Sequence, residues 1–260
     1  MIWETNYSAA EPSRAFGCLV DAWKHEDNKV FVLRTDDEIP DMQAFLSENF
    51  KYLGKPVPLA EDVTAGDRDH QRTGELWFEV RYDPRHPNAY RHSNNAQPLH
   101  TDGSYIADFP NATLLSCVAN AGEGGETTFI EAADVVAALE AEDPVLLGEL
   151  LTTDMPHARS GDSRTERIIE KRSDKYFVNW NYYCVAPATD RQRALADRFF
   201  AFLANSPMIR ERTRGVLLTP GDAVTWKDRE VLHGRNAFVA NRESERFIWK
   251  CAIDIGNFDG

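Results

Sequence analysis

Long apolar runs are missing from this 260-residue sequence. No stretch approaches the roughly 20 consecutive apolar residues that a membrane-spanning helix requires. The opening residues, Met-Ile-Trp-Glu-Thr-Asn, also lack the basic start and apolar stretch of a secretory signal. From these two absences we expect a soluble, cytoplasmic protein without a membrane partner.

Cysteine and basic residues are also scarce. The four cysteines form no Cys-x-x-Cys pair, so we expect neither a structural zinc site nor a disulfide framework. Lysine and arginine total 29 against 42 acidic residues, which gives a formal net charge of -13. This charge repels nucleic-acid phosphates, and no basic cluster offsets it. We therefore expect a small-molecule substrate and no nucleic-acid partner, and the sequence is compatible with a homo-oligomer.

Apolar residues are plentiful, and their order predicts a β-rich fold. Hydrophobic residues make up 42% of the sequence and composition does not shift sharply, so we expect one domain over residues 1–260. Helical periodicity and capping residues, with Ser13 as the first N-cap, predict helices over 13–23, 39–46, 133–141, 144–151 and 190–204. Strands are predicted over 29–33, 75–82, 113–118, 127–130, 215–218, 223–226, 231–234 and 247–253.

We expect strands 113–118 and 127–130 to pair around the glycine-rich turn at 122–125. Strands early and late in the chain, with a helical insert between them, predict a β-sandwich or barrel decorated by helices. The expected fold class is therefore mainly β with helical insertions (α+β).

The run His100-Thr101-Asp102 places an imidazole and a carboxylate two residues apart. In a strand, such residues project from the same face and can bind one metal ion. His233, within the predicted strand 231–234, supplies a third ligand, and this set leaves three positions open on Fe(II). A histidine hydrogen-bonded within the core would give the same local pattern at His233.

Arg246 and Thr127 are candidates for binding an anionic co-substrate. An arginine that projects into an apolar barrel needs an anionic partner, because a buried unpaired guanidinium is costly. A dicarboxylate is one such partner, and the hydroxyl of Thr127 could donate to the same carboxylate. A structural ion pair between Arg246 and Asp254, with Arg242 as the binding residue instead, is the alternative.

These residues occur together in a recognisable order. His100-Thr101-Asp102-Gly103-Ser104-Tyr105, Gly124-Gly125-Glu126-Thr127, Pro220-Gly221-Asp222, Leu232-His233-Gly234-Arg235 and Arg246 follow one another along the chain. The set resembles the Fe(II)/2-oxoglutarate-dependent dioxygenases of the taurine dioxygenase group. Asn88-Ala89-Tyr90 makes it most similar to the γ-butyrobetaine hydroxylase-like branch.

The resemblance implies a distorted double-stranded β-helix (jelly roll) and a set of residue roles. It implies His100, Asp102 and His233 as iron ligands, and Arg246 with Thr127 as the residues that bind 2-oxoglutarate. The implied reaction uses O2, releases succinate and CO2, and hydroxylates an unactivated C–H bond of an amino acid, betaine or related carboxylate. The alternatives are a metal-dependent hydrolase or isomerase, and a protein that binds 2-oxoglutarate without turnover.

The substrate contacts are less well defined by the sequence. Four aromatic residues could form a cage for a quaternary ammonium group, or could simply pack in the core: Trp77, Phe78, Tyr82 and Tyr90. Arg81 could bind a substrate carboxylate or an acidic neighbour. The candidate substrate-binding residues are Arg81, Tyr90, Asn94, Asn95, Ser104, Tyr105, Asn179 and Asn181.

Overall fold

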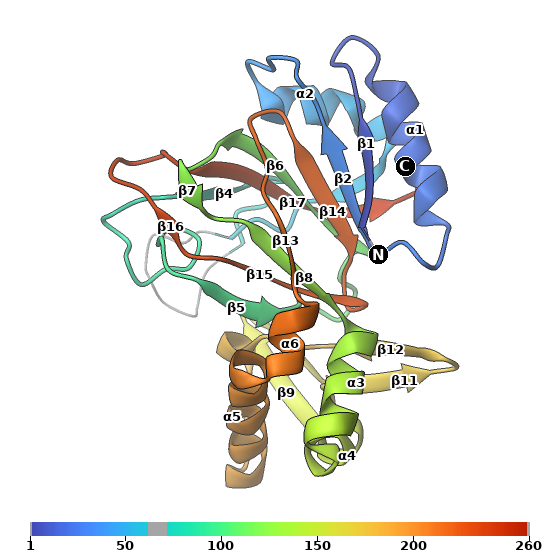
Figure 1. Ribbon diagram of the computed structural model, residues 1–260, viewed down its shortest axis with the longest axis vertical. Helices are drawn as coiled ribbons and strands as arrows, with labels where there is room; N and C mark the ends of the chain where they lie inside the picture. Colours follow the sequence, from blue (N-terminus) through green and yellow to red (C-terminus); the bar gives the residue numbers. More distant parts are fainter. Residues whose placement is uncertain (1, 62–71, 259–260) are drawn as a thin grey trace.

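The computed structural model describes residues 2–61 and 72–258, whose strands form two main sheets that face each other (Figure 1). The larger sheet has the order β1-β2-β14-β6-β17-β3, with β4 also paired to β17. Its strands are β1 (Ile2–Asn6), β2 (Val30–Arg34), β3 (Gly54–Val57), β4 (Phe78–Arg81), β6 (Ala112–Ala119), β14 (Ala223–Lys227) and β17 (Phe247–Ile255). The smaller sheet, ordered β13-β8-β15-β5, consists of β5 (Gln97–His100), β8 (Thr127–Glu131), β13 (Arg214–Val216) and β15 (Val231–Arg235).

Strand β2 shows why the larger sheet is apolar on both faces. Successive side chains of a strand point to opposite faces, so an uninterrupted apolar run serves two cores. Val30 and Val32 join the core between the sheets, where they meet Trp226 and residues of the smaller sheet. Phe31 and Leu33 point the other way and pack against helices.

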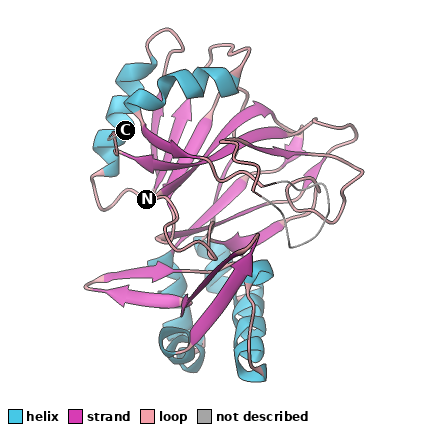
Figure 2. Ribbon diagram, turned by 180° about the vertical axis from the view of Figure 1, so that it is seen from behind, coloured by secondary structure: helices cyan, strands magenta, loops and turns pink. Residues whose placement is uncertain are grey.

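Helices cover the outer face of the larger sheet (Figure 2). They are α1 (Pro12–Trp23), α2 (Met42–Asn49) and the short η1 (Phe50–Tyr52). Phe16 and Leu19 of α1 are fully or almost fully buried against this face. The helix begins at Pro12 with Glu11 at the N-cap, so the prediction of Ser13 as the cap was wrong; proline suits a first-turn position because it lacks the amide hydrogen.

The segment between β8 and β13 forms an insert below the smaller sheet, with its own core around Trp180 and Phe199 (Figure 1). Its helices are α3 (Ala132–Glu142), α4 (Pro144–Thr152), η2 (Tyr182–Cys184), α5 (Asp190–Asn205) and α6 (Pro207–Arg212). Its strands are β9 (Asp154–Arg159), β10 (Asp162–Arg167), β11 (Ile169–Arg172) and β12 (Lys175–Val178). A further short pair joins β7 (Glu123–Gly124) to β16 (Phe238–Val239).

The predicted pairing of strands 113–118 and 127–130 was wrong. Strand β6 pairs with β14 and β17, whereas β8 pairs with β13 and β15 in the other sheet. The glycine-rich turn between them therefore carries the chain from one sheet to the other. A local hairpin signal cannot distinguish this crossover from a hairpin, because both need the same turn residues.

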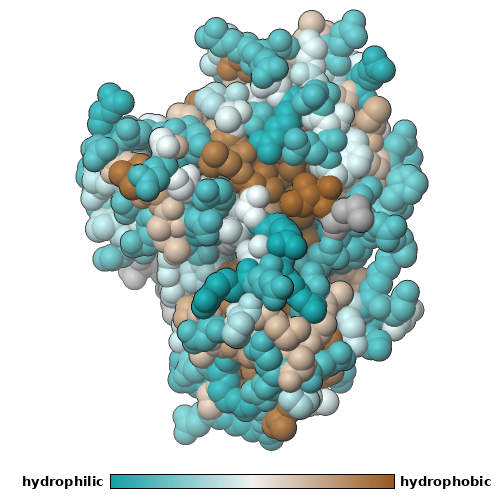
Figure 3. Space-filling view, viewed as in Figure 1, coloured by the Kyte–Doolittle hydropathy of each residue, from teal (hydrophilic) through white to brown (hydrophobic). Residues whose placement is uncertain are grey.

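All four cysteines are free, and three of them are buried. Among the described residues, no helix combines the length and apolar character that crossing a membrane requires. The face in Figure 3 is largely hydrophilic at its two ends, with hydrophobic surface gathered across its middle.

Candidate metal and co-substrate site

The two candidate histidine ligands face each other across neighbouring strands of the smaller sheet. His100 is the last residue of β5 and pairs in register with His233 of β15. Their ring centroids lie 4.1 Å apart, and both side chains are buried. The sequence pattern had suggested that Asp102 lies within a strand, but it lies in the turn just after β5. Asp102 Oδ1 lies 3.9 Å from His100 Nε2, and Asp102 Oδ2 lies 3.7 Å from His233 Nε2.

Hydrogen bonding and burial leave both imidazoles suited to bind a metal. His100 Nδ1 lies 2.9 Å from the carbonyl oxygen of Pro98, which can only accept, so the proton resides on Nδ1 and Nε2 keeps its lone pair. The Trp226 ring packs against His233, with centroids 4.4 Å apart. Burial lowers the pKa of His100, and lowers that of His233 more strongly. Both rings are therefore neutral near pH 7, which is the form that ligates.

Three neighbours orient Asp102 through hydrogen bonds, and one of them, Lys250, also helps to keep it ionised. Lys250 Nζ donates to Asp102 Oδ1 at 2.6 Å, and Thr113 Oγ1 donates to Oδ2 at 2.8 Å. The backbone amide of Asp102 donates to Asp228 Oδ1 at 3.2 Å, which fixes the turn. Burial alone would raise the pKa of Asp102, but Lys250 and the two histidines together hold it well below its usual range.

The three side chains fit a divalent transition metal. Their ligating atoms all lie within 4.8 Å of one another, and they offer two neutral imidazoles and one carboxylate. This donor set is the facial arrangement that binds Fe(II) and leaves open positions for other ligands.

Arg246 immediately precedes β17 and enters the same cavity from the larger sheet. Its side chain is buried, its Nε has no hydrogen-bond partner, and Nη2 donates to the carbonyl oxygen of Gly125 at 3.3 Å. No carboxylate of the described residues pairs with it, Asp254 included, and burial lowers its pKa to about 10. Thr127, the first residue of β8, is also buried and lines the cavity. A buried guanidinium without an acidic partner, in the same cavity as a hydroxyl, fits the distal carboxylate of 2-oxoglutarate.

Gly125 brings the chain close to Arg246. Its φ is +82°, a left-handed conformation that L side chains rarely adopt, and an added Cβ would lie 3.0 Å from Arg246 Nε. Glycine at this position therefore keeps space around the guanidinium.

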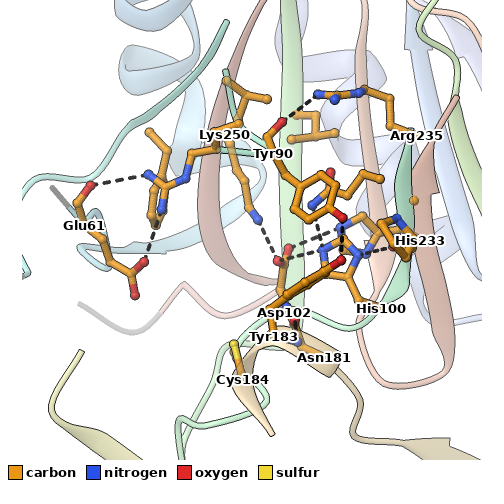
Figure 4. A pocket seen from close by; sticks show the side chains of 18 of the residues that line it. Glu61, Tyr90, His100, Asp102, Asn181, Tyr183, Cys184, His233, Arg235 and Lys250 are labelled. Carbon is orange, nitrogen blue, oxygen red and sulfur yellow. Dashed lines mark hydrogen bonds and ion pairs between the residues drawn. The ribbon is translucent and has the colours of Figure 1, made fainter. Parts of the chain in front are cut away.

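The cavity that contains these groups has a volume of about 370 Å³ (Figure 4). This size is near the lower end of the range for small-molecule sites, roughly 300–1,000 Å³. Figure 4 shows Lys250 directed at Asp102, with His100 and His233 beside that carboxylate and Tyr90 and Tyr183 nearby. The hydroxyls of Tyr90 and Tyr183 are hydrogen-bonded to each other.

The predicted substrate residues fall into three groups. Tyr90, Tyr105 and Asn181 line the cavity. Ser104 and Asn179 are buried next to each other behind its wall, where Asn179 Nδ2 donates to the carbonyl oxygen of Ser104 at 3.0 Å.

The other three, Arg81, Asn94 and Asn95, do not line the cavity. Arg81 forms ion pairs with Glu79 and Glu243, so its guanidinium is already neutralised outside the site. Asn94 and Asn95 use backbone carbonyls, which accept hydrogen bonds from Phe238 and from Arg235.

Several cavity residues were missed by the sequence analysis. Lys250 could have been found, because Arg246 just before β17 and Ile248 and Lys250 within it occupy every second position, and all three line the cavity. Glu61, Arg91, Arg159 and Tyr183 also line it, and no local pattern singles them out.

The double-stranded β-helix thus carries a His-Asp-His triad that could hold one metal ion of the non-haem iron type. The family model described as "Taurine catabolism dioxygenase TauD, TfdA family" matches residues 46–252. The chain therefore belongs to the TauD/TfdA family.

Two characterised relatives are similar over part of their length. Dioxygenase str8 of Strobilurus tenacellus is 28% identical over 197 residues, which is 70% of this chain and 46% of that protein. Uridine-5'-phosphate dioxygenase of a Streptomyces species is 27% identical over 171 residues, 60% of this chain and 61% of that protein. This chain thus spans about half to three-fifths of the relatives it matches.

Solved structures of non-haem iron oxygenases share the fold. Asparagine oxygenase in complex with Fe(II), 3-hydroxyasparagine and succinate superposes with a TM-score of 0.69 at 14% identity, over 94% of this chain and 79% of that one. The oxygenase OrfP with Fe and α-ketoglutaric acid superposes with a TM-score of 0.68 at 17% identity, over 96% of this chain and 82% of that one. PvcB of Pseudomonas aeruginosa superposes with a TM-score of 0.63 at 19% identity, over 97% of this chain and 84% of that one. The predicted jelly roll with helical insertions is confirmed.

Proposed function

We propose that this protein is an Fe(II)- and 2-oxoglutarate-dependent dioxygenase that hydroxylates an unactivated C–H bond of a small polar metabolite. One observation carries the proposal. A single cavity contains both the His100, Asp102 and His233 cluster and the buried guanidinium of Arg246, which has no acidic partner among the described residues. A metal-dependent hydrolase would need the first group but not the second.

Separate residues would bind the iron and the 2-oxoglutarate. His100, Asp102 and His233 would hold the iron, and Arg246 with Thr127 would receive the distal carboxylate of 2-oxoglutarate. Bound Fe(II) with 2-oxoglutarate and O2 supplies the oxidant for C–H cleavage, with succinate and CO2 as co-products. The protein orients these partners and keeps one side of the site dry, since Ile248 and Leu115 are buried in its wall.

The substrate class proposed is an amino acid, a betaine or a related carboxylate. The names of the relatives, which include an asparagine oxygenase and a uridine-5'-phosphate dioxygenase, support a small polar metabolite. The likeness to the γ-butyrobetaine hydroxylase-like branch rests on Asn88-Ala89-Tyr90 and the shared motifs. A full aromatic cage for a trimethylammonium group is not supported, because Trp77 and Tyr82 do not line the cavity.

Anaerobic addition of Fe(II) and 2-oxoglutarate to the purified protein tests this function. We expect a weak visible charge-transfer band from the iron chelate in the wild type, and its loss in Asp102→Ala, which removes a ligand. Arg246→Ala should need about 100-fold more 2-oxoglutarate to develop the band, corresponding to about 3 kcal/mol. Arg242→Ala, at an exposed position just before it, is the matched control and should behave as the wild type. Absence of the band in iron-loaded wild-type protein would favour a hydrolase instead.

A further inference from the structure

The cavity carries positive charge although the whole chain carries a net charge of -13. Five of the described side chains that line it are cationic and two are anionic: Arg91, Arg159, Arg235, Arg246 and Lys250 against Glu61 and Asp102. Fe(II) and the 2-oxoglutarate dianion carry opposite double charges, so their binding leaves this excess unchanged. A third, anionic component would neutralise part of it.

Part of the excess is concentrated in a cluster that the metal and co-substrate roles do not use. Arg91 and Arg159 share one carboxylate, that of Glu61. Arg91 Nη2 donates to Glu61 Oε2 at 3.1 Å, and Nη1 donates to the carbonyl oxygen of Glu61 at 3.3 Å. Arg159 Nε lies 3.4 Å from the same Oε2 and makes no hydrogen bond. Two guanidiniums and one carboxylate leave this cluster with one uncompensated positive charge.

Glu61 has little capacity for a further donor such as a substrate amine. Its Oε1 accepts from the hydroxyl of Tyr105 and, at 3.0 Å, from Ser160 Oγ. The Glu61 side chain is 3% exposed, whereas the side chains of Arg91 and Arg159 are 18% and 21% exposed. Burial would raise the pKa of Glu61, but Arg159, Tyr105 and Arg91 together lower it, so the carboxylate stays ionised. The exposed part of the cluster is therefore its cationic part.

The cluster lies close to the metal ligands. The ring of Phe78 has Arg91 Cζ at 5.0 Å and Lys250 Nζ at 5.8 Å from its centroid. Lys250 in turn contacts Asp102. A small molecule that contacts the cluster can therefore also reach the metal centre.

We propose that Arg91 and Arg159 form an anion-binding subsite that selects a substrate with a carboxylate or phosphate group. The proposal rests on the proposed function, because it concerns the substrate of that reaction. Arginine suits the role, since its planar fork binds either anion through two parallel hydrogen bonds. The same charge repels a quaternary ammonium group, so within the proposed substrate class betaines are disfavoured unless their carboxylate occupies the subsite.

Four probes of equal chain length test the subsite: butanoate, butyl phosphate, butanamide and butyltrimethylammonium. Their binding is measured by isothermal titration calorimetry at fixed ionic strength, on protein saturated anaerobically with Fe(II) and 2-oxoglutarate so that Arg246 is occupied. We expect butanoate or butyl phosphate to bind at least 10-fold more tightly than the other two. The tighter of the two anions identifies the substrate's head group as carboxylate or phosphate.

Charge variants separate anion binding from a structural role. Arg159→Gln and Arg91→Gln should weaken anion binding at least 10-fold, whereas Glu61→Gln should strengthen it several-fold by removing the competing carboxylate. Arg81→Gln, in which the lost arginine is paired with acids outside the cavity, is the matched control. If all three cluster variants weaken binding equally, or if butanamide binds as well as butanoate, the subsite is wrong.

The charge-transfer band distinguishes this failure from failure of the proposed function. Arg159→Gln should keep the band, because the cluster holds neither iron nor 2-oxoglutarate. If the wild type lacks the band, the proposed function fails, and the calorimetry is repeated on metal-free protein. There, anion binding that depends on Arg159 but not on Arg246 would still support the subsite, and binding that depends on Arg246 alone would overturn it.

Discussion

Lys250 donates a 2.6 Å hydrogen bond to Asp102, the carboxylate of the candidate metal triad. The pair is mostly buried, with side-chain exposures of 21% and 11%. In the metal-free protein Lys250 therefore supplies the positive charge that a bound metal would otherwise supply. The ligand is kept ionised and in position before the metal arrives.

This relationship predicts the behaviour of Lys250→Met. Removing one partner of a buried ion pair leaves the other charge uncompensated, which costs about 3–5 kcal/mol when burial is complete. Because both side chains are partly exposed, we expect the metal-free protein to lose about 2 kcal/mol of unfolding free energy. Fe(II) should restore much of this loss, so metal-induced stabilisation should be larger than in the wild type. Urea unfolding with and without Fe(II), under nitrogen, measures both quantities; equal metal-induced stabilisation in the two proteins would contradict the role assigned to Lys250.

Arg235 links the strand of His233 to the loop that carries Tyr90. Its guanidinium donates to the carbonyl oxygens of Tyr90, Ser93 and Asn95 at 3.1, 2.9 and 2.6 Å. Burial lowers its pKa to about 9, with a further contribution from Arg246. The residue thus positions one wall of the cavity rather than binding substrate through a free fork.

Arg235→Lys tests this positioning role. Lysine keeps the charge but cannot present a planar fork to three carbonyls, so we expect the unfolding free energy to fall by about 2 kcal/mol. Amide hydrogen exchange of residues 90–95 should become faster, while exchange in the helical insert stays unchanged. Unchanged exchange in the loop would show that other contacts hold it.

Only part of the candidate metal triad has a local signal in the sequence. His100 and Asp102 are two residues apart, whereas His233 was singled out through the order of motifs that carries the family resemblance, because a core histidine gives the same local pattern. The Arg91, Glu61 and Arg159 cluster could not be predicted, because its members come from three separate segments that only the folded chain brings together. The same reason explains the wrong strand pairing at 113–118: local residues specify a turn, but long-range packing decides which sheet each strand joins.

His157 predicts how stability depends on pH. The side chain is fully buried in the insert, its Nε2 has no hydrogen-bond partner, and burial lowers its pKa from 6.5 to about 4. Between these values the unfolded chain binds a proton that the folded protein does not, so stability is complete above pH 6.5 and falls as the pH drops toward 4. From this residue we expect a loss of about 2 kcal/mol between pH 7 and pH 5.

The measurement is urea unfolding of metal-free wild type and His157→Gln at both pH values. The variant should be less stable at pH 7, yet its loss between pH 7 and pH 5 should be smaller by about 2 kcal/mol. The pKa values of His100 and His233 are also lowered, so these residues add to the loss of unfolding free energy at low pH. They add to it equally in both proteins, and their contribution cancels in the comparison. Equal losses in the two proteins would show that another group causes the loss of stability between pH 7 and pH 5.

Gly125→Ala offers a test of the co-substrate site that leaves every polar group in place. The new methyl group would lie 3.0 Å from Arg246 Nε and would also force a residue with φ of +82° to carry a Cβ. The strain costs about 1–2 kcal/mol, and relief requires the guanidinium to move. We therefore expect the 2-oxoglutarate concentration needed for the charge-transfer band to rise about 10-fold, while iron binding is retained. Gly122→Ala, in the same turn, is the matched control, because nothing lies within 4 Å of its added Cβ and its φ is not positive. If both variants raise the required 2-oxoglutarate concentration equally, the effect belongs to the turn as a whole, and Arg246 is not the group that binds the co-substrate.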